Sequence, residues 1–372
     1  MQTRLIAFYL PQYHPIPEND EWWGKGFTEW TNVTKAKPLF RGHYQPHLPA
    51  DLGFYDLRVP ETRIHQAEIA RTYGIEGFCY WHYWFGNGKR ILEKPFNEVL
   101  KSKQPNFPFC LGWANETWTG IWHGSPNKIL MKQTYPGKED YEAHFYSLLP
   151  AFTDERCIKI DGKPIFVVFR PDKLPDPKEF TDCWRELALE VGLSGIYFIG
   201  MAGNELWEYK SDGFDAFTLH IPGDILGRIP RSLADKVCYK ITRKNFREFL
   251  RDTFSIPRTY DYRQIVQYAF PQVSPDKKFF PCVIPNWDNT PRSGANGLVF
   301  QNSTPELFRS QLRNGLALVS NQKPEERLIF IKSWNEWAEG NYLEPDRQYG
   351  TAYLEVVAEV LSSSPELVSS IP

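Results

Sequence analysis

Short, almost continuously apolar segments recur along the chain, and segments with helical periodicity separate them. The eight apolar segments are residues 5–10, 77–81, 107–113, 164–169, 195–201, 214–220, 279–284 and 328–333. They do not alternate between apolar and polar residues, which is typical of parallel strands that are buried on both faces. The pattern therefore predicts eight parallel strands.

Several of the intervening segments carry clear helix signals. Residues 60–74 begin with proline and end with glycine, both common helix boundaries. Residues 304–319 open with a threonine cap and then repeat apolar residues every three or four positions, and 351–362 place their apolar residues on one stripe. Residues 222–278 contain five prolines and are expected to form an insertion with extra helices.

Strands that alternate with helices predict an α/β fold, a single (β/α)8 TIM barrel with extended βα loops. We expect one domain over residues 1–372, because no linker, repeat or low-complexity tract divides the chain. A doubly wound open sheet usually has a glycine-rich first βα turn, whereas the first strand here runs into "YLPQYHP", which contains no glycine. In a barrel, the active centre lies at the carboxyl ends of the strands.

Composition narrows the classes of ligand. The chain has 372 residues with a net charge of −2, so no basic excess is available to neutralise nucleic acid. Aromatic residues make up 16% of the chain, and many stand close to Asn, Asp, Glu and His. Part of this content must be core, but rings next to short polar groups also suit sugars, which offer apolar faces and hydroxyl edges.

The remaining sequence signals concern compartment and cofactors. Six scattered cysteines without a CxxC pair indicate reduced thiols, and the N-terminus does not read as a signal peptide. No apolar stretch is long enough for membrane insertion, so a cytoplasmic protein is expected. Neither HExxH nor another zinc spacing is present, so no metal or cofactor is expected, and the absence of GxSxG disfavours a serine hydrolase.

Polar and aromatic residues gather after the strands, whereas the loops at the opposite ends of the strands are plain turns. The candidate substrate-binding residues are Tyr9, Tyr13 and His14 after the first strand; Trp81, His82 and Tyr83 after the second; Trp113, Asn115, Glu116 and Trp118 after the third; His220 after the sixth; Trp287 and Asp288 after the seventh; and Asn335 and Trp337 after the eighth. A lone histidine is more often structural than catalytic, and Glu116 could equally be a framework acid.

The segment "WNEWAEG" at 334–340 contains the candidate catalytic residues Glu336 and Glu339. Three residues apart on a continuing strand they would point to opposite faces, but a turn at the strand end can direct both into one cleft. Two carboxyl groups in one cleft suit glycosidic chemistry, which needs a protonated acid and an ionised partner. Apolar walls would raise the pKa of one of them. The structural alternative is a salt-bridged loop pair.

Five motifs resemble one family. "AFYLPQYHPIPENDEWWGKGFTEWTNV", "RGHYQPHLPADLGFYDLR", "GIEGFCYWHYWF", "LGWANETWT" and "KSWNEWAEGNYLEPD" are similar to the WbsX-like proteins of cell-surface polysaccharide biosynthesis, which carry a domain related to family-99 glycoside hydrolases. The resemblance covers nearly the whole chain. It implies a glycan substrate and association with other polysaccharide-biosynthesis enzymes.

The family-99 endo-α-mannosidases are more distant relatives with a strand-eight motif NEWHEG, which resembles residues 335–340 here. Their seventh-strand loop is similar to "IPNWDNTPR". By this resemblance Glu336 is the base that deprotonates the substrate's 2-hydroxyl to form a 1,2-anhydro sugar, and Glu339 is the acid and then the base, with retention of configuration. The chain has Ala338 where those hydrolases have His, so α-mannose specificity is not carried over.

Three functions follow as hypotheses. The first is a cytoplasmic, metal-independent enzyme that acts on a glycosidic bond of a surface polysaccharide or an oligosaccharide. The second is a glycosyltransferase or transglycosylase of O-antigen or capsule biosynthesis, although no DxD pair or Rossmann fingerprint indicates a nucleotide-sugar site. The third is a non-catalytic glycan-binding barrel, which would keep the tryptophans without needing both acids.

Overall fold

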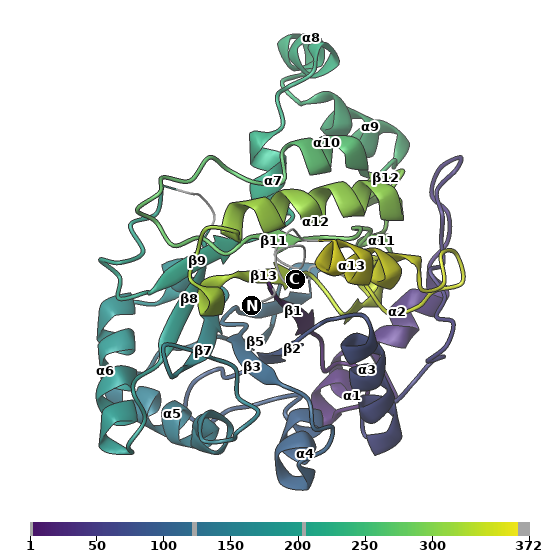
Figure 1. Cartoon of the computed structure of the whole chain (residues 1–372). Helices are drawn as coiled ribbons and strands as arrows, with labels where there is room; N and C mark the ends of the chain where they lie inside the picture. The colour runs from purple at the N-terminus through teal and green to yellow at the C-terminus, as the bar shows by residue number, and fades with distance from the viewer. Residues whose placement is uncertain (1–2, 121–124, 203–205, 364–372) are drawn as a thin grey trace.

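Eight parallel strands form the centre of the molecule (Figure 1), seen here in a computed structural model that describes residues 3–120, 125–202 and 206–363. In sheet order they are β11 (Cys282–Val283), β13 (Leu328–Ile331), β1 (Arg4–Tyr9), β2 (Gly77–His82), β3 (Phe109–Trp113), β7 (Lys163–Val168), β8 (Tyr197–Ala202) and β9 (Ala216–Leu219). Each lies within or overlaps one of the eight predicted apolar segments.

The sheet curves until its two edge strands nearly meet. Phe217 of β9 bridges in parallel to Phe279, just before β11. The Phe217 amide donates to the Lys278 carbonyl at 3.0 Å, and the Phe280 amide donates to the Phe217 carbonyl at 2.9 Å. The predicted (β/α)8 TIM barrel is therefore confirmed, with this bridge as its closing contact.

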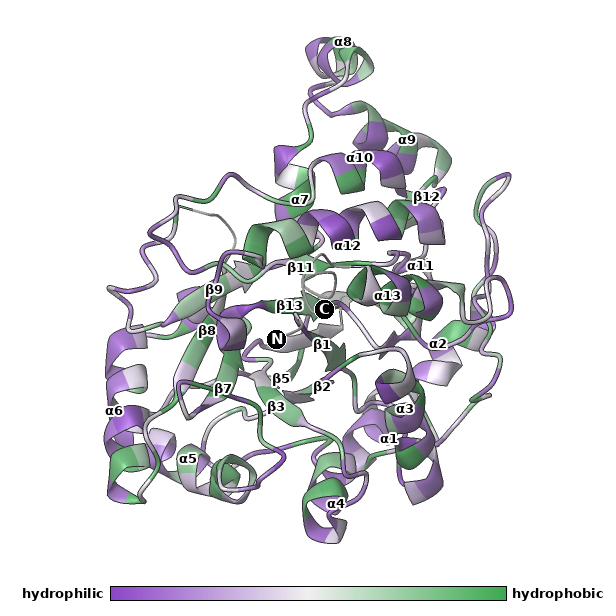
Figure 2. Ribbon diagram, in the orientation of Figure 1, coloured by the Kyte–Doolittle hydropathy of each residue, from purple (hydrophilic) through white to green (hydrophobic). Residues whose placement is uncertain are grey.

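Burial on both faces explains why the strands show no alternation. The exposed fraction is 1% or less for Leu5, Ile6, Ala7, Phe8 and Tyr9 of β1, although successive side chains point in opposite directions. One set fills the barrel and the other packs under the helices. Figure 2 shows β3 and much of β7 and β8 in hydrophobic colours, whereas the surrounding helices carry both hydrophobic and hydrophilic residues. Each fully buried Leu, Ile or Phe stabilises the fold by about 1.5–3 kcal/mol.

Helices surround the barrel: α1 (Pro17–Trp23), α2 (Glu29–Lys35), α3 (Pro60–Thr72), α4 (Lys94–Ser102), α5 (Lys138–Phe152), α6 (Pro177–Glu190), α12 (Pro305–Val319) and α13 (Ala352–Ser362). Three of them lie where the sequence predicted helices: α3 from its proline and glycine boundaries, and α12 and α13 from their apolar periodicity. The threonine cap of α12 is formed as expected, since the Thr304 hydroxyl accepts a hydrogen bond from the Leu307 amide at 3.3 Å.

The predicted helical insertion is confirmed between β9 and β11. It contains α7 (Gly223–Arg228), α8 (Leu233–Thr242), α9 (Phe246–Phe254), β10 (Arg258–Asp261) and α10 (Tyr262–Gln267). Strand β10 pairs in parallel with β12 (Leu298–Gln301), and α8 projects away from the barrel at the far end of the insertion (Figure 1).

Short elements cover the carboxyl ends of the strands. They include the antiparallel pair β4 (Trp118–Gly120) and β5 (Ser125–Met131), the short helix α11 (Thr290–Ser293), and the antiparallel pair β14 (Asn335–Glu336) and β15 (Asn341–Tyr342). At the opposite end, β6 (Lys159–Ile160) forms a hairpin with β7. None of the six cysteines, all within the described residues, is paired in a disulfide. No helix of the described residues is long and apolar enough to cross a membrane.

Candidate active site

A cavity of about 700 Å³ opens at the carboxyl ends of the strands. This is within the usual range for small-molecule sites. Its lining comes from the loops after β1, β2, β3, β7, β11 and β13 and from the β4–β5 pair. The polar and aromatic lining residues are Gln12, Trp23, Phe27, Glu29, Asn32, Trp81, Tyr83, Asn115, Glu116, Thr117, Trp118, Thr119, Gln133, Tyr135, Phe169, Lys173, Arg292, Lys332, Glu336 and Glu339.

A tight turn brings the two glutamates to one side. Residues Trp337–Glu339 form a single 3₁₀ turn that joins β14 to β15, so Glu336 and Glu339 stand three residues apart on a helix with three residues per turn. Gly340 ends the turn at φ +58°, and a Cβ there would lie 2.9 Å from the Asp288 backbone nitrogen. The turn thus depends on a glycine that fits a left-handed conformation against a neighbouring loop.

Glu336 is surrounded by groups that favour its ionised form. Its Oε1 accepts a hydrogen bond from the Trp81 indole at 3.0 Å, and the Lys332 ammonium lies 3.5 Å from its Oε2. Burial alone would raise the pKa of Glu336, but Lys332, a hydrogen bond shared with Glu339 and the charge of Arg292 together lower this pKa.

Glu339 has a different set of neighbours. Its Oε1 lies 2.5 Å from a terminal nitrogen of Arg292, and the same guanidinium also binds Glu29 through its Nε at 3.0 Å. Burial raises the pKa of Glu339 to about 8, against the pull of Arg292 and with the help of the negative charge on Glu336. Three buried carboxyl groups thus surround two buried cations, Arg292 and Lys332, and one retained proton makes the cluster neutral.

Aromatic rings form the walls beside the acids. Trp81 stacks on Phe8, with ring centroids 4.7 Å apart. Trp118 makes edge-on contacts with Trp22 and Tyr83, with ring centroids 6.0 and 5.2 Å apart. The stacking and edge contacts hold these rings in place at the cavity, where an apolar sugar face could lie against them.

The structure brings together part of the predicted site. The predicted residues that line the cavity are Trp81, Tyr83, Asn115, Glu116, Trp118, Glu336 and Glu339. Asn115 is already engaged, since its amide bonds the Arg170 backbone at 2.7 and 2.8 Å. Glu116 accepts from Arg170 at 2.6 Å while its side chain remains 41% exposed at the rim.

A second group lies behind the two acids and holds their turn. The Tyr13 hydroxyl donates to the Asn335 carbonyl and accepts from the Trp337 amide at 3.0 Å. The Asn335 side chain accepts from the Leu10 amide at 2.7 Å, and the Trp337 indole donates to Glu344 at 2.6 Å. Burial raises the pKa of Glu344 to about 7.

A third group of predicted residues lies outside the cavity lining. Three of them make hydrogen bonds within the protein: Tyr9 to Gln66, Trp113 to the Trp84 carbonyl, and His82 with His144. Three others are His14, which is buried, His220, which packs on Phe169, and Trp287, which lies near Lys332. Asp288 faces the other way, accepting from His43 at 2.6 Å and from Gln45 at 2.7 Å next to a separate cavity of about 340 Å³.

Three residues at the centre of the site, Glu29, Lys332 and Arg292, are absent from the predicted set. Lys332 follows the apolar strand β13, where a lysine within the segment "LIFIKS" is an unusual residue in a buried position. Arg292 lies in α11, and its link to Glu29 spans 263 residues of sequence, which no local pattern indicates. Within the described part of the chain, no group of three or more His, Cys, Asp or Glu side chains is placed to hold a metal ion.

Comparisons with known proteins agree on a fold and a family. The model of the family described as "Glycosyltransferase WbsX" matches residues 5–357. Two curated relatives, both described as "Uncharacterized protein WxcX" of Xanthomonas campestris pv. campestris, are 36% identical over all 372 residues. The chain spans about half the length of these relatives, 51%.

Two solved structures share the fold at low identity. The GH99 endo-alpha-mannosidase of Bacteroides thetaiotaomicron has a TM-score of 0.56 at 15% identity, with 99% of both chains covered. A protein described as "Glycoside hydrolase-like protein" has a TM-score of 0.60 at 14% identity, with 97% of this chain and 94% of that chain covered. The fold is therefore that of a family-99-like glycoside hydrolase barrel.

Proposed function

The chain belongs to the family described as Glycosyltransferase WbsX, and from this premise we propose that it is an enzyme acting on a glycosidic bond of a surface polysaccharide or an oligosaccharide. The observation that carries the proposal is the contact between Glu336 and Glu339 in a sugar-sized cavity, with their pKa values shifted in opposite directions. At neutral pH this gives one carboxylate and one carboxylic acid side by side.

Both carboxyl groups come from one short turn and act on each other, since the negative charge of Glu336 helps to raise the pKa of Glu339. This placement favours attack by the substrate's own 2-hydroxyl over the two-carboxylate schemes, in which the acids flank the scissile bond. The 2-hydroxyl and the glycosidic oxygen sit on neighbouring carbons of a sugar, so adjacent acids can reach both.

Each step balances with these two groups alone. The Glu336 carboxylate takes the proton of the 2-hydroxyl while O2 bonds to C1, and Glu339 gives its proton to the departing glycosidic oxygen. The products of this step are a 1,2-anhydro sugar and a free leaving group. A water or an acceptor hydroxyl then attacks C1 and gives its proton to Glu339, and Glu336 returns its proton to O2 as the C1–O2 bond breaks. Two displacements at C1 retain the configuration.

The lining residues offer contacts for a bound sugar. Trp81 and Trp118 offer ring faces, and Tyr83, Asn115 and Glu116 offer polar atoms at the cavity. We propose that the other predicted residues position the lining residues. Tyr13, Asn335 and Trp337 hold the turn that carries Glu336 and Glu339, and the remaining predicted residues hold the loops around the cavity. A cytoplasmic location and association with other polysaccharide-biosynthesis enzymes belong to the same proposal.

Transfer is the second candidate, and the family description favours it. If an acceptor sugar replaces water in the second step, the same two glutamates build a glycosidic bond. Incubation with labelled oligosaccharides separates the two reactions, because hydrolysis releases a new reducing end and transfer gives a longer chain with no net release.

The test is loss of turnover in Glu336→Gln and in Glu339→Gln. With a panel of surface oligosaccharides, each variant should lose at least about a thousandfold in rate, with unfolding midpoints close to that of the wild type. Glu306→Gln, on the exposed start of α12, is the matched control and should keep full activity. Near-full activity of both active-site variants would exclude the mechanism. Sugar binding without turnover, unchanged in both variants, would instead indicate a glycan-binding barrel.

A further inference from the structure

The end of the helical insertion presents apolar side chains to solvent. Leu233, Val237 and Ile241 of α8 are 77%, 50% and 78% exposed. They are four residues apart, so they form one stripe along the helix. The stripe faces away from the protein, because Asp235 on the opposite side is the one buried residue of α8.

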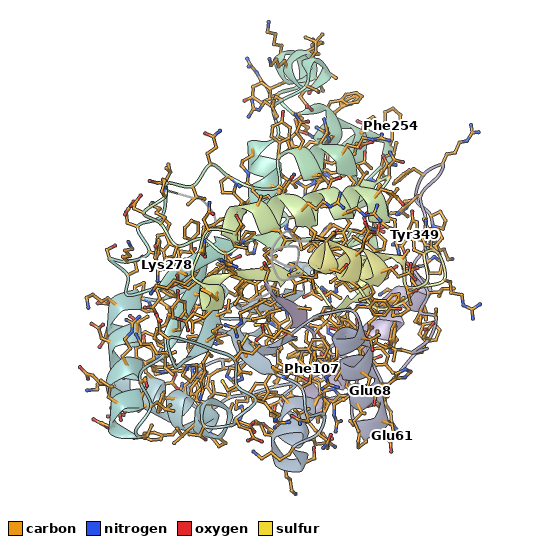
Figure 3. All side chains as sticks on the ribbon, in the orientation of Figure 1. Glu61, Glu68, Phe107, Phe254, Lys278 and Tyr349 are labelled. Carbon is orange, nitrogen blue, oxygen red and sulfur yellow. The ribbon has the colours of Figure 1, made fainter. Side chains whose placement is uncertain are left out.

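The next helix also exposes apolar side chains. Phe246 and Phe254 of α9 are 39% and 61% exposed, and no residue of α9 is buried. Figure 3 shows Phe254 at the outer edge of the insertion. Six of the fifteen large hydrophobic residues exposed in the described part of the chain fall between 233 and 254. These six, which we call the insertion patch, are Leu233, Val237, Tyr239, Ile241, Phe246 and Phe254. Such clustering is not the scattered exposure usual on a soluble surface.

Positive charge surrounds the insertion patch. Residues 228–258 contain nine Lys and Arg and three Asp and Glu, a net charge of +6 in a chain whose total is −2. Lys236, Lys240 and Arg243 are exposed, and within the described residues no acidic side chain pairs with them. On the helix, Lys236 and Lys240 lie directly beside the apolar stripe, at three and seven positions from Leu233.

Internal contacts fix α8 and α9 to each other on their inner side. Asp235 caps α8 through the Ser232 hydroxyl at 2.7 Å, accepts from the Phe246 amide at 3.1 Å, and pairs with Arg247 at 3.1 Å. The two helices are therefore joined by polar contacts, and their apolar residues are left for an outside partner.

We propose that the insertion patch docks on an anionic phospholipid surface. Apolar residues on one face of a short helix with lysines at their flanks are typical of helices that lie in the plane of a bilayer. Each basic side chain near such a surface adds attraction for acidic headgroups. A protein partner fits less well, because stable protein interfaces bury about 800 Å² on each side over about 20–30 residues. The insertion patch has six apolar residues on α8 and α9, and α8 projects away from the barrel (Figure 1). This inference goes beyond the proposed function, since none of these residues lines the cavity.

The test is co-flotation of the full chain with vesicles. The probe is vesicles of phosphatidylcholine with about 30% phosphatidylglycerol, compared with phosphatidylcholine alone, at about 0.1 M salt. The wild type should partition at least about tenfold more strongly to the anionic vesicles. The triple variant Leu233→Ser/Val237→Ser/Ile241→Ser and the double variant Lys236→Glu/Lys240→Glu should each reduce this partition at least about tenfold.

Matched controls separate the insertion patch from exposed residues in general. Leu189→Ser/Leu318→Ser removes exposed leucines of α6 and α12, and Lys101→Glu/Lys323→Glu reverses exposed lysines elsewhere; both should bind vesicles as the wild type does. The proposal is overturned if the wild type does not float with anionic vesicles, or if these controls lose as much binding as the patch variants. If the wild type binds no vesicle but sediments as a dimer that the triple variant converts to a monomer, the insertion patch is a protein contact instead.

Discussion

Lys332→Met tests whether the charge of this lysine keeps Glu336 ionised. The substitution keeps an apolar stem of similar length between the rings of Trp81 and Trp287, which lie 5.8 and 5.6 Å from the ammonium. It removes only the positive charge. Because Glu336 and Glu339 share a proton, the measured quantity is the first ionisation of the pair, which belongs mainly to Glu336.

The size of the effect follows from the distance. Opposite charges 3.5 Å apart attract by roughly 5 kcal/mol at an effective dielectric constant of about 20. This corresponds to an upper bound of about 3 to 4 pKa units. The exposed fractions of the two side chains are 7% and 6%, so water screens the pair little. The Trp81 indole and Arg292 remain, so we expect the first ionisation to rise by about 2 units.

The measurement needs no substrate. Carbon-13 spectra of protein labelled at the glutamate carboxyl carbons report each ionisation, and Glu336→Gln and Glu339→Gln assign the signals. Lys173→Met is the matched control, because Lys173 lines the same cavity but is 55% exposed, and its removal should shift the first ionisation by less than about 0.5 units. A shift in Lys332→Met as small as that of the control would refute the electrostatic reasoning.

Two further predictions concern stability. The pKa of Glu339 is raised to about 8, so the folded state holds an extra proton up to that pH, and stability from this group falls as the pH rises from about 5 to about 8. Urea unfolding of the wild type should therefore show that the free energy of unfolding decreases by a few kcal/mol over this pH range. The decrease should be smaller in Glu339→Gln and the same as in the wild type in Glu306→Gln. Equal decreases in all three proteins would contradict the raised pKa of Glu339. Gly340→Ala should destabilise the fold by at least about 1 kcal/mol more than Gly350→Ala. Both glycines have φ near +57°, but only at Gly340 does the added Cβ meet Asp288 at 2.9 Å, and equal unfolding midpoints would show that this contact is harmless.

The barrel could be predicted because its signals are local. A strand buried on both faces must be apolar throughout, and a helix against the barrel must repeat its apolar residues with the helical period. The strand lengths were less accurate. Residues 279–284 are predicted as one strand, but only Cys282–Val283 form a ladder with β13, and Phe279 pairs with β9 through an isolated bridge.

Aromatic residues after the strands could not be sorted by sequence. Trp113 and Trp118 stand five positions apart in one motif, yet Trp113 is 1% exposed and donates to the Trp84 carbonyl, whereas Trp118 lines the cavity. Trp113 is the last residue of β3, whereas Trp118 is the first residue of β4 and belongs to the antiparallel β4–β5 pair. Neither placement is encoded in the identity or spacing of the tryptophans.

The assignment of acid and base also depends on contacts that sequence does not display. Glu336 and Glu339 are the same residue type on the same turn, and nothing in "NEWAEG" distinguishes their pKa values. The Lys332 ammonium lies 3.5 Å from Glu336 and the Trp81 indole donates to Glu336, whereas Arg292 binds both Glu339 and Glu29. Glu29 already neutralises part of the Arg292 charge, so Arg292 stabilises the ionised form of Glu339 less. The proton that makes the cluster neutral therefore stays on Glu339.

The groups that set the pKa values of Glu336 and Glu339 therefore come from several parts of the fold. Glu29 comes from α2, Arg292 from α11, Lys332 from the end of β13, and the two acids from the turn between β14 and β15. If Glu29 were neutral, Arg292 would be wholly available to Glu339, whose pKa would fall. Glu29 would act on the proposed general acid through Arg292. A carboxylate 263 residues away from its arginine in sequence therefore belongs to the charge cluster around the two proposed catalytic acids.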